Sequence, residues 1–200
     1  MINDTKVIIT DKTYLIFDLD GTIIDTDKAN FLSYQEAVKK VKNMELKSLY
    51  KGNERFTREK LNLIIPNLTI KEYEKIIKIK TDAFDKYLKN TKSNNAILEI
   101  IKQFSQTNKI ILATNSHAIK ANLLLKYYNL FNIFDKKYYQ ESYLKSKDNK
   151  YQYILNDLNV TPSNVIIFED NHNEIDKAIN LGIPSENIIN PIIKGDKNYE

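Results

Sequence analysis

Three short apolar runs, each ending in polar residues, constrain the fold of this chain more than any other feature. The runs are TYLIFDL at 13–19, KIILAT at 109–114 and NVIIFE at 164–169. They are rich in branched and aromatic residues, which is typical of strands buried on both faces of a parallel sheet. Helical patterns follow them, and ENIINP at 186–191 indicates a weaker fourth strand. This alternation predicts an α/β fold, a doubly wound three-layer α/β/α core with right-handed crossovers.

Residues 25–92 follow a different pattern. Apolar residues recur there at helix period, in AVKKVKNMELKSLY, REKLNLII and IKEYEKIIKIKTDAFDKYL, without a buried strand. We therefore expect a small all-helical domain over 25–92, inserted after the first strand, and an α/β core domain built from 1–24 and 93–200. Thr69 and Glu72 predict a capping box at the start of the long helix that follows Thr69. Ser116 is the expected N-cap of the helix after the second run.

Composition narrows the range of partners. The 30 basic and 26 acidic residues give a net charge of +4 and are interspersed, which favours a solvated surface over a nucleic-acid interface. The chain has no cysteine, which excludes disulfides and thiolate metal sites. No apolar run approaches the ~20 residues of a membrane span, and the first residues lack the pattern of a secretory signal. We expect a cytoplasmic monomer or homodimer that binds neither nucleic acid nor membrane.

Polar side chains gather where the three runs end. The segments are Asp18-Leu19-Asp20-Gly21-Thr22, Thr114-Asn115-Ser116 and Glu169-Asp170-Asn171. Ligands of open parallel sheets bind beyond the carboxyl ends of the strands. Carboxylates from two strand ends can hold Mg²⁺, and hydroxyls and backbone amides can hold phosphoryl oxygens.

Plainer interpretations exist for the same residues. The first segment alone is also compatible with a turn or part of a calcium loop. Glu169 and Asp170 can instead favour the start of the next helix through its dipole, and Thr114 can be an ordinary strand-end hydroxyl. His117 and His172 receive no metal role, because two histidines without a third partner make a poor metal site.

The motifs FDLDGT, ILATNS and VIIFEDN resemble, in order and spacing, the first, second and fourth signatures of the haloacid dehalogenase-like superfamily. The resemblance implies a Rossmann-like core with a helical cap of the first class, near the branch of β-phosphoglucomutase and the phosphoglycolate phosphatases. The third signature is a lysine ahead of a Leu-Gly-Val-x-Pro turn, and counting back from Leu158 to Pro162 places it at Lys145. Lys147 and Lys150 compete for this role, since Ser146 replaces the usual proline.

The resemblance also implies a role for each matching residue. Asp18 is the expected nucleophile, which forms an aspartyl phosphate, and Asp20 the expected general acid and base. The residues expected to bind the phosphoryl group are Leu19, Thr114, Asn115 and Lys145, with Thr114 and Lys145 neutralising its charge. The expected Mg²⁺ ligands are the side chains of Asp18 and Asp170 and the main chain of Asp20, with Glu169 as a possible further ligand.

Within the insertion, the segment from Lys51 to Arg55 resembles a substrate-specificity loop. Arg55 can bind a phosphate or carboxylate bidentately, although a solvated helix start is an equal alternative, and Arg58 receives no role. Asn30 stands where the mutase has a histidine, which favours hydrolysis over phosphoryl isomerisation. We therefore expect a Mg²⁺-dependent phosphohydrolase of a small phosphorylated metabolite. A phosphomutase is the main alternative, and a phosphate-accepting regulatory protein is disfavoured by the inserted helices.

Overall fold

A computed structural model describes residues 8–49, 55–146 and 148–191 of the chain. The described residues divide into two compact units, one built from residues 8–24 and 93–191, the other from residues 25–92. The first unit contains β1 (Tyr14–Phe17), α5 (Asn95–Phe104), β4 (Lys109–Ala113), α6 (Ala118–Tyr127), β5 (Lys136–Tyr138), α7 (Gln140–Tyr143), α8 (Lys150–Leu158), β6 (Val165–Phe168), α9 (His172–Asn180) and β7 (Ile188–Ile189). The second contains α1 (Asp27–Lys42), α2 (Leu46–Leu49), α3 (Arg58–Ile64), α4 (Ile70–Ala83) and the 3-10 helix η1 (Phe84–Asn90). Two short strands, β2 (Ile24–Asp25) and β3 (Lys92–Ser93), form a separate two-stranded sheet.

The first unit is built on a five-stranded sheet in the order β5-β4-β1-β6-β7, and its paired strands run parallel. The central strand β1 aligns Phe17 with Leu112 of β4 and with Phe168 of β6. The rings of Phe17 and Phe168 stack with centroids 4.4 Å apart. Because the strands are parallel and in this register, the residues that follow them emerge at one edge of the sheet.

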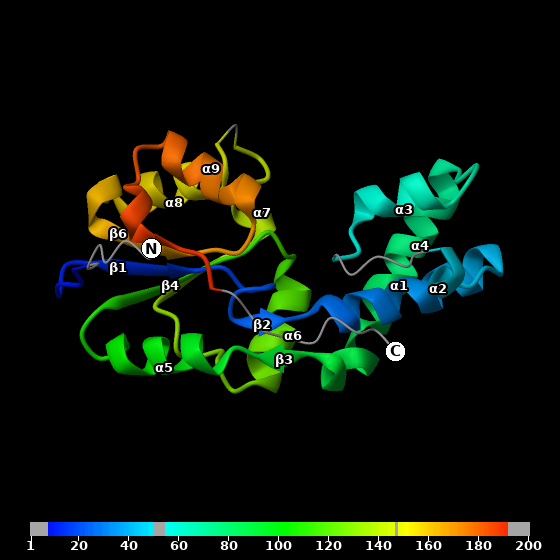
Figure 1. Cartoon of the computed structure of the whole chain (residues 1–200), viewed down its shortest axis with the longest axis horizontal. Coiled ribbons are helices and arrows are strands. Elements are labelled where there is room, and N and C mark those ends of the chain that lie inside the picture. The colour runs from blue at the N-terminus through cyan, green and yellow to red at the C-terminus, as the bar shows by residue number, and fades with distance from the viewer. Residues whose placement is uncertain (1–7, 50–54, 147, 192–200) are drawn as a thin grey trace, which may run out of the picture. The chain divides into compact units, whose positions relative to one another are not determined.

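Helices cover both faces of this sheet, as Figure 1 shows with α8 and α9 on one side and α5 on the other. Ile16, Ile111 and Ile167 lie side by side in the register and belong to one buried cluster. Tyr151 and Ile154 of α8 complete that cluster from the helical layer. The expected three-layer α/β core is therefore confirmed.

The strands of the five-stranded sheet correspond to the expected ones with one addition, and the short strands β2 and β3 are not predicted by the sequence pattern. The three apolar runs form β1, β4 and β6, and the weaker fourth candidate forms β7. The sequence pattern does not predict the strand β5, because its KKY segment is short and carries two lysines. It lies at the edge of the sheet beside β4, where polar residues are tolerated.

The second unit is all helical and has its own hydrophobic core. Phe31, Tyr34 and Val38 of α1 pack in this core with Phe56 and with Ile76 of α4. The ring of Phe56 makes edge contacts with the rings of Phe31 and Tyr34, at centroid distances of 6.0 and 5.1 Å. The expected capping box is present at the start of α4, where the side chain of Thr69 accepts a hydrogen bond from the amide of Glu72 and the side chain of Glu72 accepts one in return.

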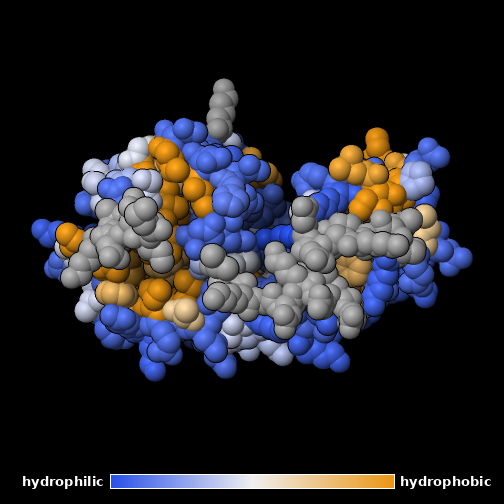
Figure 2. Space-filling model, viewed as in Figure 1, coloured by the Kyte–Doolittle hydropathy of each residue, from blue (hydrophilic) through white to orange (hydrophobic). Residues whose placement is uncertain are grey.

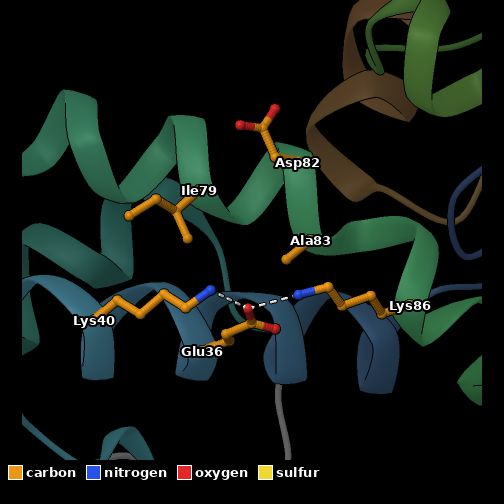
Figure 3. Close-up of a pocket in the computed structure, with 6 residues that line it drawn as sticks. All are labelled: Glu36, Lys40, Ile79, Asp82, Ala83 and Lys86. Carbon is orange, nitrogen blue, oxygen red and sulfur yellow. Dashed lines mark hydrogen bonds and ion pairs between the residues drawn. The ribbon is translucent and has the colours of Figure 1, made fainter.

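An ion-pair cluster joins α1 to η1 beside a shallow pocket of about 170 Å³ in the helical unit (Figure 3). The Lys40 and Lys86 ammonium groups both point to Glu36 and donate to its Oε1, at 2.6 and 2.9 Å. Tyr87 donates to the other carboxylate oxygen. Lys40, Lys86 and Tyr87 together lower the pKa of Glu36 to about 2.

The face shown in Figure 2 is mostly hydrophilic, with apolar areas over part of the α/β unit and over α3. Leu63 of α3 and Ile70 of α4 are among the exposed apolar residues of the helical unit. Within the described parts of the chain, every helix is too short or too polar to cross a bilayer.

Candidate active site

The carboxyl ends of β1, β4 and β6 place Asp18, Thr114 and Glu169 next to one another in buried positions. The amide of Asp18 donates to the carbonyl of Phe168, and that of Thr114 donates to Tyr138, so the sheet's hydrogen bonds continue into the site. All three side chains are less than a tenth exposed. The sheet therefore fixes the backbone of these residues, which favours a preorganised site.

A tight loop follows β1 and positions Asp170. Gly21 has a φ of 95°, and a Cβ built on it would lie 2.2 Å from Oδ2 of Asp170, so only glycine fits there. The hydroxyl of the next residue, Thr22, donates to Oδ1 of Asp170 at 3.1 Å. The side chain of Leu19 is fully buried, so only its main chain can serve a ligand.

The lysine beside the expected nucleophile is Lys150, not Lys145. Its Nζ donates to Oδ1 of Asp18 at 3.1 Å and to Oε2 of Glu169 at 2.7 Å, and its side chain is 1% exposed. Lys145 is exposed, and Lys147 lies outside the described residues. Lys145 is therefore not the lysine that contacts Asp18, because a fixed spacing counted back from the Leu158–Pro162 turn does not show which lysine is buried. The sequence signal that could identify Lys150 is Asn149, the N-cap of α8. Its side chain accepts from the amide of Gln152, which makes Lys150 the first residue of the helix.

Burial and crowded charge shape the electrostatics at Asp18. Burial raises the pKa of Asp18 well above its usual value and Glu169 raises it further, whereas Lys150 lowers it. Burial lowers the pKa of Lys150, but Asp18, Tyr151 and Glu169 outweigh this and raise it well above its usual value, so the ammonium stays charged. Burial and the neighbouring carboxylates thus outweigh Lys150 and favour the neutral form of Asp18.

The carboxylates of Asp18, Glu169 and Asp170 form a group that fits a hard divalent cation. One oxygen from each lies within 4.8 Å of the others. An all-oxygen, anionic donor set suits Mg²⁺, whose charge would favour the ionised form of Asp18. These residues therefore agree with the expected magnesium site.

Glu169 makes several hydrogen bonds within the site. Oε2 of Glu169 already accepts from Lys150 and from the Tyr151 hydroxyl, and Oε1 accepts from the amide of Asn171. The N-cap of α9 is Asn171, whose side chain accepts from the amide of Asn173. Glu169 thus mainly holds Lys150 and Tyr151, and it lies in the same carboxylate group as Asp170.

Asp20 is held from the segment that follows β4. The Ser116 hydroxyl donates to Oδ2 of Asp20 at 2.6 Å, and Nζ of Lys120 lies 2.5 Å from Oδ1. Ser116 is not the helix cap that the sequence predicts, because α6 begins one residue later with His117 as its N-cap. The sequence does not predict that Ser116 and Lys120 contact Asp20. The sequence signal for Lys120 is its position in the first turn of the helix predicted after the second apolar run.

Thr114 and Asn115 lie where a phosphoryl group would be expected. Oγ1 of Thr114 accepts from the amide of Ser116 at 3.0 Å, and its proton has no acceptor within the described part of the chain. The buried Tyr143 hydroxyl donates to the carbonyl of Thr114 and to Oδ1 of Asn115. The Thr114 hydroxyl can therefore donate to a ligand from a fixed position.

The remaining candidates make local contacts. Arg55, in the helical unit, pairs with Asp27 at 3.4 Å, and residues 51–54 of the expected specificity loop lie outside the described residues. Asn30 is buried and donates to Oγ1 of Thr26. His117 contacts Glu141 at 2.9 Å, which accepts from the first amide of α6.

Comparisons with known proteins agree with this geometry. The family model described as haloacid dehalogenase-like hydrolase matches residues 15–188. A phosphorylated carbohydrates phosphatase of Thermotoga maritima is 27% identical over 177 residues, which cover 84% of this chain and 81% of that protein. Two solved structures are similar in fold. A β-phosphoglucomutase-like protein of Thermotoga maritima has a TM-score of 0.67 and 21% identity, covering 92% of this chain and 89% of its own. A predicted phosphoglycolate phosphatase of Haemophilus somnus has a TM-score of 0.70 and 20% identity, and the match covers 87% of this chain and 84% of that protein.

The chain thus has a parallel α/β sheet with an aspartate pair after its central strand and a second acidic pair after a neighbouring strand. The match over most of its length shows that the chain belongs to the haloacid dehalogenase-like hydrolases. The family resemblance inferred from the three motifs and the assignment to an enzyme class are thus confirmed.

Proposed function

We propose that the protein is a Mg²⁺-dependent phosphohydrolase of a small phosphorylated metabolite, which acts through an aspartyl phosphate on Asp18. The observation that carries the proposal is the buried carboxylate of Asp18, in contact with Lys150 and grouped with Asp170. The phosphatase from Thermotoga maritima supports a phosphorylated carbohydrate as the substrate class.

In the proposed mechanism an oxygen of Asp18 attacks the phosphorus atom as the bond to the leaving oxygen breaks. Asp20 gives its proton to that oxygen, and in the second step it takes a proton from the water that hydrolyses the aspartyl phosphate. Lys150 and the Thr114 hydroxyl bind phosphoryl oxygens and stabilise their charge. Mg²⁺ bound by the side chains of Asp18 and Asp170 and the main chain of Asp20 would add further positive charge at the phosphoryl group.

Hydrolysis is favoured over a phosphomutase activity by Asn30. A carboxamide cannot relay a proton as a histidine does, and this one donates to Thr26 within its own helical unit. The helical unit, residues 25–92, is proposed to act as a cap that limits access of water. Arg55 is proposed to contribute to substrate recognition from that unit.

Phosphate release from a panel of phosphorylated sugars, and from para-nitrophenyl phosphate, tests the proposal. We expect release with Mg²⁺ and none with excess chelator, and we expect Asp18→Asn to abolish it while thermal stability is kept. Asp176→Asn is the matched control, because Asp176 is an exposed carboxylate on α9 that should leave the rate unchanged. Full activity of the Asp18→Asn variant would refute the mechanism.

A further inference from the structure

Lys120 is an unusually placed lysine that no motif predicts. It lies in the first turn of α6, and its Nζ is 2.5 Å from Oδ1 of Asp20. The side chains of Lys120 and Asp20 are only 14% and 7% exposed. A sequestered ion pair contributes little stability once the desolvation of both charges is counted, so a functional reason for its position is needed.

The carboxylate of Asp20 is held at both oxygens. Lys120 contacts Oδ1, while the Ser116 hydroxyl donates to Oδ2 at 2.6 Å. Two contacts on different oxygens restrict both side-chain torsions of an aspartate, because either rotation would break one of them. The position of this carboxylate is therefore set by the chain after β4 rather than by its own loop alone.

The segment that carries these two groups is itself well anchored. The amide of Ser116 donates to Oγ1 of Thr114, and the carbonyl of Ser116 accepts from the amide of Gln140. Glu141 accepts from the amide of Ala118 at the start of α6. Lys120 thus projects from a fixed helix start toward Asp20.

The two aspartates of the motif have different ammonium partners. Lys150 contacts Asp18 and Glu169, whereas Lys120 contacts Asp20. This division matches two chemical tasks, since the nucleophile must meet phosphorus and the acid must reach the leaving oxygen. Acid catalysis depends on a hydrogen-bond distance of about 2.6–3.2 Å between the acid and the atom it protonates.

We propose that Lys120, assisted by Ser116, is a positioning residue that holds the carboxylate of Asp20 in place for proton transfer. This role rests on the proposed phosphohydrolase function. Asp20 gives one proton to the leaving oxygen and regains one from the attacking water. Lys120 keeps its own protons throughout and only donates a hydrogen bond.

The test compares two substrates that differ in their need for an acid. A sugar phosphate leaves as an alkoxide that must be protonated, whereas para-nitrophenyl phosphate releases a stable phenolate that need not be. We expect Lys120→Met to lower kcat on the sugar phosphate by about 100-fold, the usual range for acid catalysis, with KM unchanged. The first-turnover burst of nitrophenolate should fall by less than about threefold, because its leaving group needs no acid.

Variants of the same site and helix supply the controls. Lys120→Arg should recover part of the lost rate, and Ser116→Ala should show the same substrate dependence with a smaller loss. Lys126→Met, which removes an exposed lysine from the same helix, should leave the rates on both substrates unchanged. In an Asp20→Asn background, Lys120→Met should cause no further loss, since its target is already disabled.

Three results would overturn the positioning role. One is an equal loss on both substrates, another is a raised KM with unchanged kcat, and the third is a full additional loss in the Asp20→Asn background. Failure of the phosphohydrolase proposal looks different, because the wild-type protein would then release no phosphate from either substrate, and the role of Lys120 would fall with it.

Discussion

At the scale of single residues, the position of Lys150 matters most for the chemistry. Its ammonium is buried between Asp18 and Glu169, and Tyr151 also donates to Glu169, so each member of this group is held by another. A lysine that makes such contacts can act on a phosphoryl group bound at Asp18. An exposed lysine five residues earlier cannot be fixed in the same way.

Replacing Lys150 should therefore disable the enzyme, and replacing Lys145 should not. Lys150→Met keeps the length of the side chain and removes its charge, so we expect kcat to fall by about 100-fold to 1000-fold, as for other preorganised donors. Lys145→Met should stay within about twofold of the wild type, since exposed positions tolerate substitution. Steady-state rates on para-nitrophenyl phosphate measure both losses. A larger loss for Lys145→Met than for Lys150→Met would contradict the role assigned to Lys150.

Gly21 offers a second test at this scale, because another glycine with a positive φ, Gly182, can serve as its control. Gly21→Ala places a methyl group 2.2 Å from Oδ2 of Asp170, so Asp170 must move away from the other two carboxylates. Gly182, with a φ of 85°, has open space around it, and a Cβ added there would meet no atom within 4 Å. Both changes should cost ~1–2 kcal/mol of stability through backbone strain.

Only the first change should impair the site. We expect Gly21→Ala to need at least tenfold more Mg²⁺ for half-maximal activity, and Gly182→Ala to need the wild-type amount. Titration of activity with Mg²⁺, alongside denaturant unfolding, separates the two effects. An unchanged Mg²⁺ requirement in Gly21→Ala would show that Asp170 is not a ligand.

At the scale of elements, the sequence predicts those whose signal is local. The strands β1, β4 and β6 are apolar because both faces are buried, and the capping box of α4 needs only Thr69 and Glu72. The edge strand β5 escapes prediction because pairing with β4, rather than its own composition, makes KKY a strand.

The misplaced features have a common physical cause. The sequence predicts Ser116 as a helix cap, but its hydroxyl donates to Asp20, which is 96 residues away in the chain. Spacing alone selects Lys145, although the start of α8 at Lys150 decides which lysine is buried. Long-range hydrogen bonds and loop lengths are set by the tertiary structure, so a single sequence carries little signal for them.

The Glu36 cluster provides a pH-dependent prediction for the helical unit (Figure 3). The folded pKa of Glu36, about 2, lies below its ordinary value of 4.5, so its ionised form stabilises the folded state. This contribution is fully present above pH 4.5 and is lost as the pH falls toward 2. We expect Glu36→Gln to cost ~1 kcal/mol at neutral pH and clearly less at about pH 3.

Denaturant unfolding of the full chain at both pH values measures this difference. Glu74→Gln is the control, because Glu74 is an exposed carboxylate on α4 whose loss should change stability little at either pH. An equal cost for Glu36→Gln at both pH values would mean that the ion pairs with Lys40 and Lys86 do not stabilise the unit.

At the scale of the whole molecule, the two units have separate cores, and the three-carboxylate cluster lies in one of them. The cluster of Asp18, Glu169 and Asp170 belongs to the α/β unit, and the core around Phe31 and Ile76 belongs to the helical unit. A ligand stabilises the structure that binds it by an amount that grows with the logarithm of its concentration. Magnesium should therefore act unequally on the two units.

Amide hydrogen exchange with and without Mg²⁺ should reveal this difference. At a Mg²⁺ concentration about 100 times its dissociation constant, we expect β1 and β6 to gain up to about 2.7 kcal/mol of protection. Helices α1 and α4 should gain little, because the described members of their core cluster all lie within residues 25–92. Asp170→Asn should remove the gain in β1 and β6 and leave α1 and α4 as they were. Equal gains in both units would show that they unfold as one cooperative structure, and no gain in either would argue against a magnesium site at the three carboxylates.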